Sequence, residues 1–222
     1  MLITIFCIRI DGIALVILAL VPICMAAILG FAFLNLHPFL AKNSPVTADV
    51  LVVEGWLPDY AIEAAAMEFK NGAYQKLITI GGSIPRGMYL SEYKNFAELA
   101  GATLTAIGVD PAQLFIVADT TQSLGRTSSS AAILEHWLST VEPQIIAINL
   151  FTLGTHSRRS WLLFEQTLAP QISVGILSAK PLNYDPHQWW YSSEGVRTVI
   201  SELLAYLYVL FMHYRTLGWI IH

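Results

Sequence analysis

The chain carries few charged residues and almost no cysteine, and both shortages limit what it can be. Only 13% of its residues are charged, whereas 55% are hydrophobic. That composition is too apolar for an ordinary soluble domain. The two cysteines, Cys7 and Cys24, lie in or beside an apolar amino-terminal run, so the rest of the chain has no thiol for a disulfide. The net charge of −4 argues against nucleic acid as a partner, because nucleic-acid binding needs a basic surface.

Several catalytic signatures are absent as well. The sequence contains no G-x-S-x-G nucleophile elbow, no Walker lysine motif and no G-x-G-x-x-G dinucleotide fingerprint. Its six histidines have no recognisable zinc-binding spacing with either cysteine. We therefore expect neither covalent serine hydrolysis nor a structural zinc site, and the sequence identifies no metal ligand set and no cofactor.

One long apolar run predicts a membrane segment. Gly12–Leu36 contains 25 residues without a charge, enough to cross a hydrocarbon core of about 30 Å at about 1.5 Å per residue. Pro22 lies inside the run, which a membrane helix tolerates. The alternative is a cleaved signal peptide, but the run exceeds a 7–15-residue signal core and no clear cleavage site precedes Pro38. We predict a retained transmembrane helix over residues 12–36.

The flanking charges bear on orientation. Arg9 and the amino terminus precede the run, and Lys42 follows it closely. The positive-inside rule gives a slight preference for a cytoplasmic stub, residues 1–11, and an extracytoplasmic domain. The predicted location is therefore the inner (plasma) membrane, with a single pass.

Residues 37–48, with two prolines, are interpreted as a linker, and from Asp49 short apolar runs alternate with helical periods. The predicted strands are Val50–Val53, Leu77–Ile80, Leu114–Val117, Ile145–Leu150 and Ile172–Leu177. The predicted helices between them are Asp59–Asn71, Ser91–Ala100 (ended by Gly101), Thr127–Thr140 and Ser157–Leu168. This alternation predicts an α/β domain over residues 49–195 with a mostly parallel, doubly wound sheet.

The tail, residues 196–222, predicts a further helix. Its apolar run, Leu203–Met212, is too short to span a bilayer alone. The helix could cover the sheet or lie at the membrane interface. We favour the packed helix, because Arg197 and Glu202 would then face the ligand site described next.

The most informative stretch is Phe151–Ser160, which follows a strand and opens a helix. It places Thr155, His156 and Arg159 at the carboxyl end of the sheet, where open α/β sheets bind ligands and where helix amino termini favour anions. His156 is a candidate acid, base or phosphate ligand. Arg159 stands three residues further on and so shares its helix face, whereas Arg158 points elsewhere.

Two acidic residues follow other strands of the predicted sheet. Glu54 comes after the first strand and Glu92 opens the helix after the second. Either carboxylate could position water or a metal in catalysis. Alternatively, Glu54 could cap the following helix and Glu92 could interact with the dipole of its own helix.

Glycine and hydroxyl groups complete the candidate ligand site. Gly81-Gly82 could allow a phosphate to approach the backbone, or could simply form a tight turn. Arg126-Thr127 precedes a serine-rich helix start, where one hydroxyl is expected to cap the helix and Arg126 to contact an anion.

Taken together, these segments resemble the YdcF/SanA/ElyC family of bacterial envelope-associated proteins. The resembling pieces, in chain order, are Asp49–Gly55, Ile80–Gly82, Ser91-Glu92, Gly108-Val109, Arg126-Thr127, Gly154–Ser160, Trp189–Gly195 and Glu202. The resemblance implies a Rossmann-like three-layer α/β/α sandwich, often tethered to the inner membrane by one amino-terminal helix. It also implies a link to cell-envelope integrity and to peptidoglycan or lipid-carrier metabolism, and one cytoplasmic relative binds S-adenosylmethionine.

The expected function is therefore a membrane-anchored role in envelope biogenesis. The ligand would be anionic or phosphorylated, such as a lipid-linked peptidoglycan or polysaccharide precursor, with hydrolysis or transfer at a phosphate ester as the reaction of an enzyme. One alternative is a non-catalytic module that contacts envelope membrane proteins, for which Trp189-Trp190-Tyr191 is a candidate surface. The other is an S-adenosylmethionine-binding enzyme.

Overall fold

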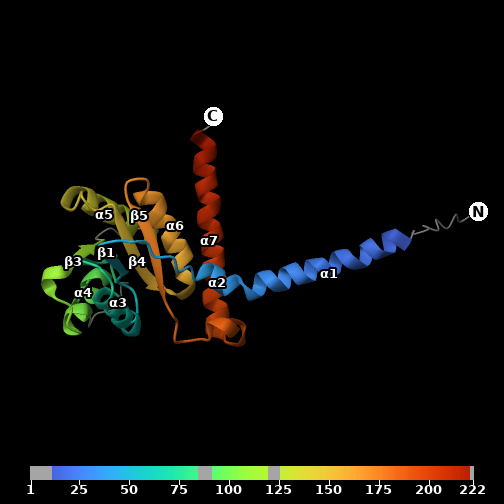
Figure 1. The fold of residues 1–222 in the computed structure, drawn as a ribbon, viewed down its shortest axis with the longest axis horizontal. Coiled ribbons are helices and arrows are strands. Elements are labelled where there is room, and N and C mark those ends of the chain that lie inside the picture. The colour runs from blue at the N-terminus through green and yellow to red at the C-terminus, as the bar shows by residue number, and fades with distance from the viewer. Residues whose placement is uncertain (1–11, 85–91, 120–125, 221–222) are drawn as a thin grey trace, which may run out of the picture. The chain divides into compact units, whose positions relative to one another are not determined.

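The computed structural model describes residues 12–84, 92–119 and 126–220, with side chains described from residue 20 to residue 212 within these ranges. The chain forms two compact units, Met1–Leu36 and His37–His222. The predicted cytoplasmic stub lies outside the described residues. The second unit contains the whole sheet (Figure 1).

The sheet has five strands, all paired in parallel, in the order β3-β2-β1-β4-β5. The strands are β1 (Val50–Glu54), β2 (Lys76–Gly81), β3 (Leu114–Ala118), β4 (Ala147–Leu153) and β5 (Ser173–Ala179). The chain winds outward from β1 to β3 and then returns beside β1 as β4. This Rossmann-like arrangement confirms the predicted fold class and places the topological switch point between β1 and β4.

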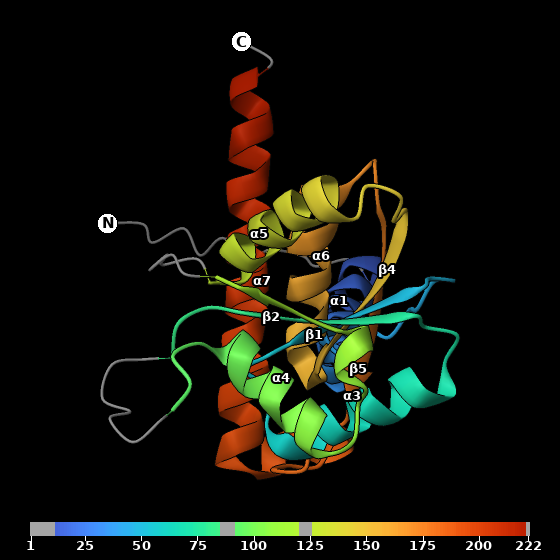
Figure 2. The same ribbon diagram turned by 90° about the vertical axis from the view of Figure 1, so that its left-hand side faces the viewer.

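Four helices form the outer layers: α3 (Asp59–Asn71), α4 (Phe96–Ala106), α5 (Arg126–Val141) and α6 (Ser157–Leu168). Figure 2 shows α5 and α6 on one face of the sheet and α3 and α4 on the other. Alternate side chains of β1 enter two separate cores. Val50 and Val52 pack with α5 and α6, whereas Leu51 and Val53 pack with α3 and α4. Because both faces are covered, the strands are mostly apolar, as parallel strands are.

The predicted bounds of one helix and one strand were wrong by two or more residues at both ends, and most other bounds differ by one or two residues. The helix predicted over Ser91–Ala100 is α4, Phe96–Ala106, and Asn95 caps it by accepting a hydrogen bond from the Glu98 backbone at 2.8 Å. Gly101 does not end this helix. A Cβ atom there would come within 2.8 Å of Ile116 on β3, so the glycine permits close packing of helix on strand. Ser91 lies outside the described residues.

The strand predicted over Ile145–Leu150 is β4, which begins and ends later. Ile145 forms a turn instead, its backbone N–H donating to the Glu142 carbonyl at 3.0 Å. At the other end, Phe151 still pairs with β1, and Leu153 still pairs with β5. The strand therefore carries Thr152 into the sheet, with consequences for the site.

The segment interpreted as a linker, residues 37–48, belongs to the same compact unit as the sheet. It begins within the short helix α2 (Leu36–Leu40). Ser44 forms an antiparallel bridge with Ile176, and the Asn149 side-chain amide bonds both the N–H and the carbonyl of Val46 at 2.9 and 2.8 Å. These bonds attach the segment to β4 and β5.

Two long helices lie at the ends of the chain. Helix α1 (Gly12–Leu34) contains Pro22 and is apolar, but the part whose side chains are described, Leu20–Leu34, is shorter than a membrane span. Helix α7 (Ser193–Ile220) starts after the short helix η3 (Pro186–Tyr191). Within the described residues, Ser193–Met212 of α7 is the stretch long and apolar enough to cross a membrane. A membrane span by α1 stays a prediction.

Candidate functional site

A cavity of about 620 Å³ lies at the carboxyl edge of the sheet, where the ends of β1 and β2 meet the amino ends of α5 and α6 and one face of α7. Eight of the ten predicted site residues line it. They are Glu54, Gly81, Gly82, Arg126, Thr127, His156, Arg159 and Glu202. Residues separated by up to about 150 positions in sequence therefore meet at the switch point of the sheet.

The two other predicted residues do not line the cavity. Glu92 is exposed to solvent, so the structure does not bring it together with His156 and Glu54. Thr155, next to His156, is only 1% exposed and is buried beneath the site. Sequence reasoning missed Trp56, two residues after Glu54, and the apolar side chains of α7 that follow Glu202 at helical spacing.

Glu54 is buried at the end of β1, with 3% of its surface exposed. Its carboxylate accepts hydrogen bonds from Thr152 of β4 and from Ser160 of α6, the latter at 2.9 Å. Burial raises the pKa of Glu54, but the charge of His156 and these hydrogen bonds outweigh it and hold the pKa below its usual value. Glu54 is thus an ionised acid within the site and does not cap helix α3.

Glu202 reaches the same site from α7. Its Oε1 lies 2.9 Å from His156 Nδ1, and its Oε2 accepts from Arg159 Nε at 2.9 Å. Arg159 Nη2 also donates to Oε1, at 3.1 Å, which makes the pair bidentate. Burial opposes ionisation of this carboxyl, but the hydrogen bonds from His156 and Arg159 lower its pKa to about 2.

His156 lies between the two carboxylates. Its Nε2 is 3.7 Å from Glu54 Oε2, and the edge of the Trp56 ring packs on the imidazole with centroids 4.9 Å apart. Burial disfavours the charged imidazole, but Glu54 and Glu202 together raise its pKa to about 9. His156 is therefore an imidazolium at neutral pH, and can give a proton or hold an anion but cannot take a proton from water.

The proton on Nδ1 of His156 points to Glu202. Arg159 Nη2 is also 2.9 Å from Nδ1, but both nitrogens are donors when the imidazole is charged. Each therefore directs its hydrogen at the carboxylate. The other ring nitrogen, Nε2, is buried 3.7 Å from Glu54 Oε2, beyond hydrogen-bond distance, and has no hydrogen-bond partner among the described residues.

The charges of this cluster nearly cancel. Glu54 and Glu202 supply two negative charges, and His156 and Arg159 supply two positive ones. Arg126, the first residue of α5, also lines the cavity and is exposed, and none of the salt bridges between described residues involves it. Among the described residues that line the cavity, Arg126 is thus the charged side chain outside this cluster, and it sits at the positive end of a helix dipole.

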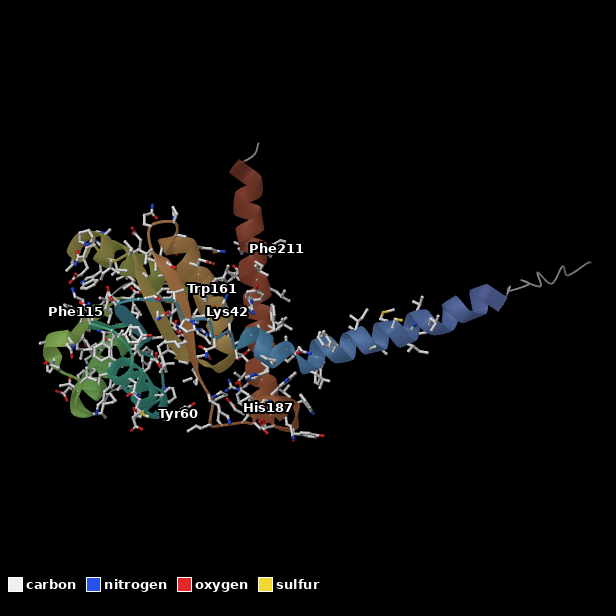
Figure 3. All side chains as sticks on the ribbon, viewed as in Figure 1. Lys42, Tyr60, Phe115, Trp161, His187 and Phe211 are labelled. Atoms are coloured by element: carbon white, nitrogen blue, oxygen red, sulfur yellow. The ribbon has the colours of Figure 1, made fainter. Side chains whose placement is uncertain are left out.

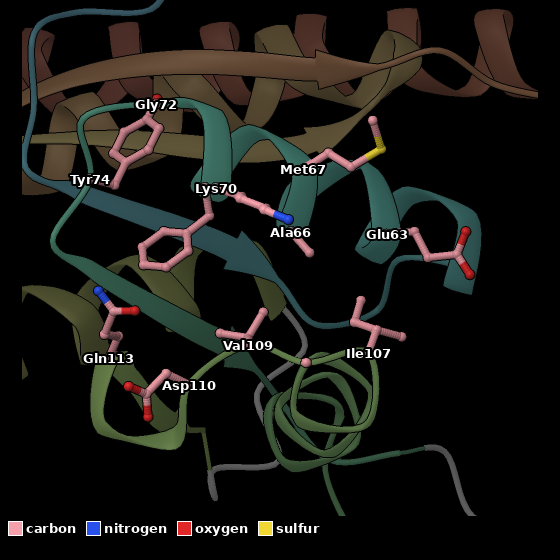
Figure 4. Close-up of a pocket in the computed structure, with 12 residues that line it drawn as sticks. Glu63, Ala66, Met67, Lys70, Gly72, Tyr74, Ile107, Val109, Asp110 and Gln113 are labelled. Atoms are coloured by element: carbon pink, nitrogen blue, oxygen red, sulfur yellow. The ribbon is translucent and has the colours of Figure 1, made fainter.

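A second cavity, of about 630 Å³, lies near the amino ends of β2 and β3 (Figure 4). It is lined by α3 and by the loop after α4, and its charged side chains include Glu63, Lys70 and Asp110. No salt bridge between described residues joins these three groups. The carboxyl-edge cavity, with its connected charges, is the candidate functional site.

Within the described part of the chain, no group of three or more His, Cys, Asp or Glu side chains has the arrangement of a metal site. Comparison with known proteins found no protein-family model and no curated protein that matches this chain. The resemblance to the YdcF/SanA/ElyC family therefore stays a prediction.

Proposed function

We propose that this protein binds a phosphorylated ligand in the carboxyl-edge cavity and serves cell-envelope biogenesis at the inner membrane, with α1 as its anchor. One observation carries the ligand proposal. The guanidinium of Arg126 and the first turn of α5 line the same cavity as the imidazolium of His156. An anion in that cavity gains charge-assisted hydrogen bonds that a neutral ligand does not.

The amino end of α5 supplies the phosphate contacts. Helix amino termini carry backbone N–H groups without intrahelical partners, and these groups point at bound phosphates in many proteins. Thr127 and Ser128 add hydroxyl groups beside Arg126. Gly82, which also lines the cavity, has no side chain to fill it, and a Cβ atom there would lie at an ordinary van der Waals distance, 3.8 Å, from Asp119 Oδ2. The phosphate would therefore sit between α5 and the end of β2.

Apolar side chains of α6 and α7 form part of the cavity lining. They are Leu163 of α6 and Ala205 and Val209 of α7. A small inorganic anion would leave these side chains exposed to water, whereas a ligand with an apolar portion would cover them. This apolar lining supports a lipid-linked peptidoglycan or polysaccharide precursor as the ligand.

The geometry also supports one chemical step, hydrolysis of the phosphate ester. Water attacks phosphorus, the ester P–O bond breaks, and the departing oxygen takes the proton from His156 Nε2. The proton released by the attacking water restores the imidazolium. Glu54 stabilises the positive imidazole before its proton is given up and after it is restored, and Arg126 neutralises charge on the phosphoryl oxygens.

A second function, ligand binding without catalysis, is favoured by a specific observation. Both acids that line the cavity are engaged in ion pairs and have lowered pKa values, so neither is well suited to take a proton from the attacking water. A protein of this kind would sense the precursor and pass the signal to envelope membrane proteins.

The test is a thermal-shift titration of the full chain in detergent with inorganic phosphate, a polyprenyl phosphate, a nucleotide sugar and S-adenosylmethionine. A ligand at 100 times its Kd stabilises the native state by about 2.7 kcal/mol. We expect the phosphorylated lipid to stabilise the protein, and the shift to be lost in Arg126→Ala but kept in Lys70→Ala, which changes the second cavity. Equal shifts in both variants would overturn the proposed site.

Phosphate release from the ligand that binds then separates the two functions. If the protein is an enzyme, the wild-type protein should release phosphate from this ligand and the His156→Gln variant should not. Binding without release by the wild-type protein supports the sensing function.

A further inference from the structure

Helix α7 exposes a large apolar surface along the part whose side chains are described. Its exposed large apolar side chains are Val196, Ile200, Leu204, Leu207, Tyr208, Phe211 and Met212. Over Ser193–Met212 the mean hydropathy is 1.5 and 11% of the stretch is buried. Apolar surface of this extent on a helix marks an interaction site.

This surface lies where α7 leaves the domain. Val199, near the start of the helix, is fully buried, and Glu202 points into the cavity. Beyond them the helix projects past the sheet and past α5 and α6 in both views (Figures 1 and 2). Leu204 is 62% exposed and Phe211 is 60% exposed. Within the described chain, Leu203–Met212 of α7 is therefore only partly covered by protein.

The distribution of the apolar residues indicates what covers it. A partner helix would bury a narrow stripe flanked by polar residues, as in coiled coils. From Leu203 to Met212, in contrast, the sequence is Leu-Leu-Ala-Tyr-Leu-Tyr-Val-Leu-Phe-Met, without a charge or an amide on any side. Leu207 and Tyr208, about 100° apart on a helix, are both at least half exposed. A helix that is apolar all round and not buried in protein is suited to lipid.

Basic and aromatic groups lie beside this helix. The Arg158 guanidinium is 3.9 Å from the centre of the Phe39 ring, which in turn packs against Tyr206 of α7 with centroids 5.8 Å apart. Lys42 lies 3.2 Å over the ring of Trp161, and burial together with the charge of Arg158 lowers its pKa (Figure 3). Lysine or arginine next to aromatic rings is typical of the headgroup level of a membrane.

We propose that Leu203–Met212 of α7 is embedded in one leaflet of a bilayer, with Lys42 and Arg158 at anionic lipid headgroups. Ten helical residues measure about 15 Å, half of a hydrocarbon core, so this stretch enters the membrane without crossing it. Because Ala205 and Val209 of the same stretch line the cavity, the cavity opens at the bilayer surface. The inference rests on the proposed function for the location of the protein at the membrane. It adds α7 as a second membrane contact beside the proposed anchor α1.

The test uses the full chain with Cys7→Ser and Cys24→Ser, reconstituted into vesicles of phosphatidylethanolamine and phosphatidylglycerol. A nitroxide is attached at Leu207→Cys or at Phe211→Cys, and at the exposed α5 position Glu135→Cys as the matched control. We expect the α7 labels to collide with oxygen more than with a water-soluble nickel complex, and the α5 label to show the reverse. Replacing phosphatidylglycerol with a zwitterionic lipid should make the α7 labels shallower, because Lys42 and Arg158 lose their anionic partners.

Two outcomes would overturn the inference. Labels on α7 that collide mainly with nickel would place the helix in water. Spin–spin broadening between α7 labels that is lost on dilution with unlabelled protein would show that a second copy covers the helix. Phosphorylated-ligand binding, measured in the same vesicles, separates this failure from failure of the proposed function, because binding with aqueous α7 labels would remove only the membrane contact.

Discussion

At the scale of the residue, the site depends on a histidine held between two carboxylates. Glu54 and Glu202 approach opposite nitrogens of His156, at 3.7 and 2.9 Å, and come from different ends of the domain. Each hydroxyl or guanidinium group that binds these acids keeps them ionised, and the ionised acids keep the imidazole charged. The ionisation of His156 is therefore a sensitive measure of whether the whole cluster is assembled.

The first prediction concerns the pH dependence of stability. The folded-state pKa of His156, about 9, exceeds the unfolded value of about 6.5. A raised folded pKa contributes stability that is fully present below about pH 6.5 and is lost as pH rises through about 9. We expect the wild-type protein to lose more stability than His156→Gln between pH 6.5 and 9, measured by urea denaturation at each pH. An imidazole that titrates near pH 6.5 by NMR would contradict this.

The second prediction concerns Glu202. Glu202→Gln removes the negative charge shared by His156 and Arg159, and hydrogen bonds to charged groups contribute about 1.5–3 kcal/mol. Because this carboxylate is 16% exposed, we expect a loss at the lower end of that range in urea denaturation at pH 7. Glu194→Gln is the matched control on α7, since its ion pair with Arg197 is exposed to solvent, and it should change stability little. Equal losses in both variants would show that Glu202 has no special role.

At the scale of the element, the sequence predicted some segments to the residue and misplaced others. Helices α3 and α6 begin and end as predicted, because their apolar period runs unbroken to a clear boundary. Helix α4 was misplaced because Gly101 was interpreted as a helix terminator. The better signal was Asn95 with Glu98 three residues later, which resembles a capping box. Gly101 is a glycine because α4 packs closely against β3 at that position. Contact between two elements cannot be predicted from the pattern of residues within one of them.

The third prediction tests the attachment of residues 44–48 to the sheet. A Cβ atom on Gly175 would lie 1.9 Å from Asn149 Oδ1 and 2.6 Å from the Val46 backbone nitrogen. Gly175→Ala should therefore displace the Asn149 amide from Val46 and cost about 1–3 kcal/mol, as overpacking does. Chemical denaturation of both single variants and of the double variant with Asn149→Ala forms a cycle. In the Asn149→Ala background the Gly175→Ala cost should be smaller, and strictly additive costs would show that the two positions do not compete for space.

At the scale of the whole molecule, topology explains why much of the site could be predicted. In a parallel sheet all carboxyl ends lie at one edge, so Glu54, His156 and Arg126 were expected together before their side-chain partners were known. The pairings themselves could not be predicted. Thr152 and Ser160 meet at Glu54 only because β1, β4 and α6 converge there, and Glu92, which follows the second strand in sequence, is exposed and does not line the cavity.

The fourth prediction separates the two ends of α7. The first end supplies Glu202 to the site, and the last end lies beyond the cavity. Deleting residues 213–222 leaves Glu202 and the cavity wall in place, so the pKa of His156 should stay near 9. Deleting residues 200–222 removes Glu202, and Glu54 alone must then offset the burial of the imidazole, so the pKa should fall. NMR titration of the histidine measures both values, and far-UV circular dichroism confirms that each chain is folded. An unchanged pKa in the longer deletion would show that Glu54 holds the proton by itself, and α7 would then serve only the cavity wall and the membrane.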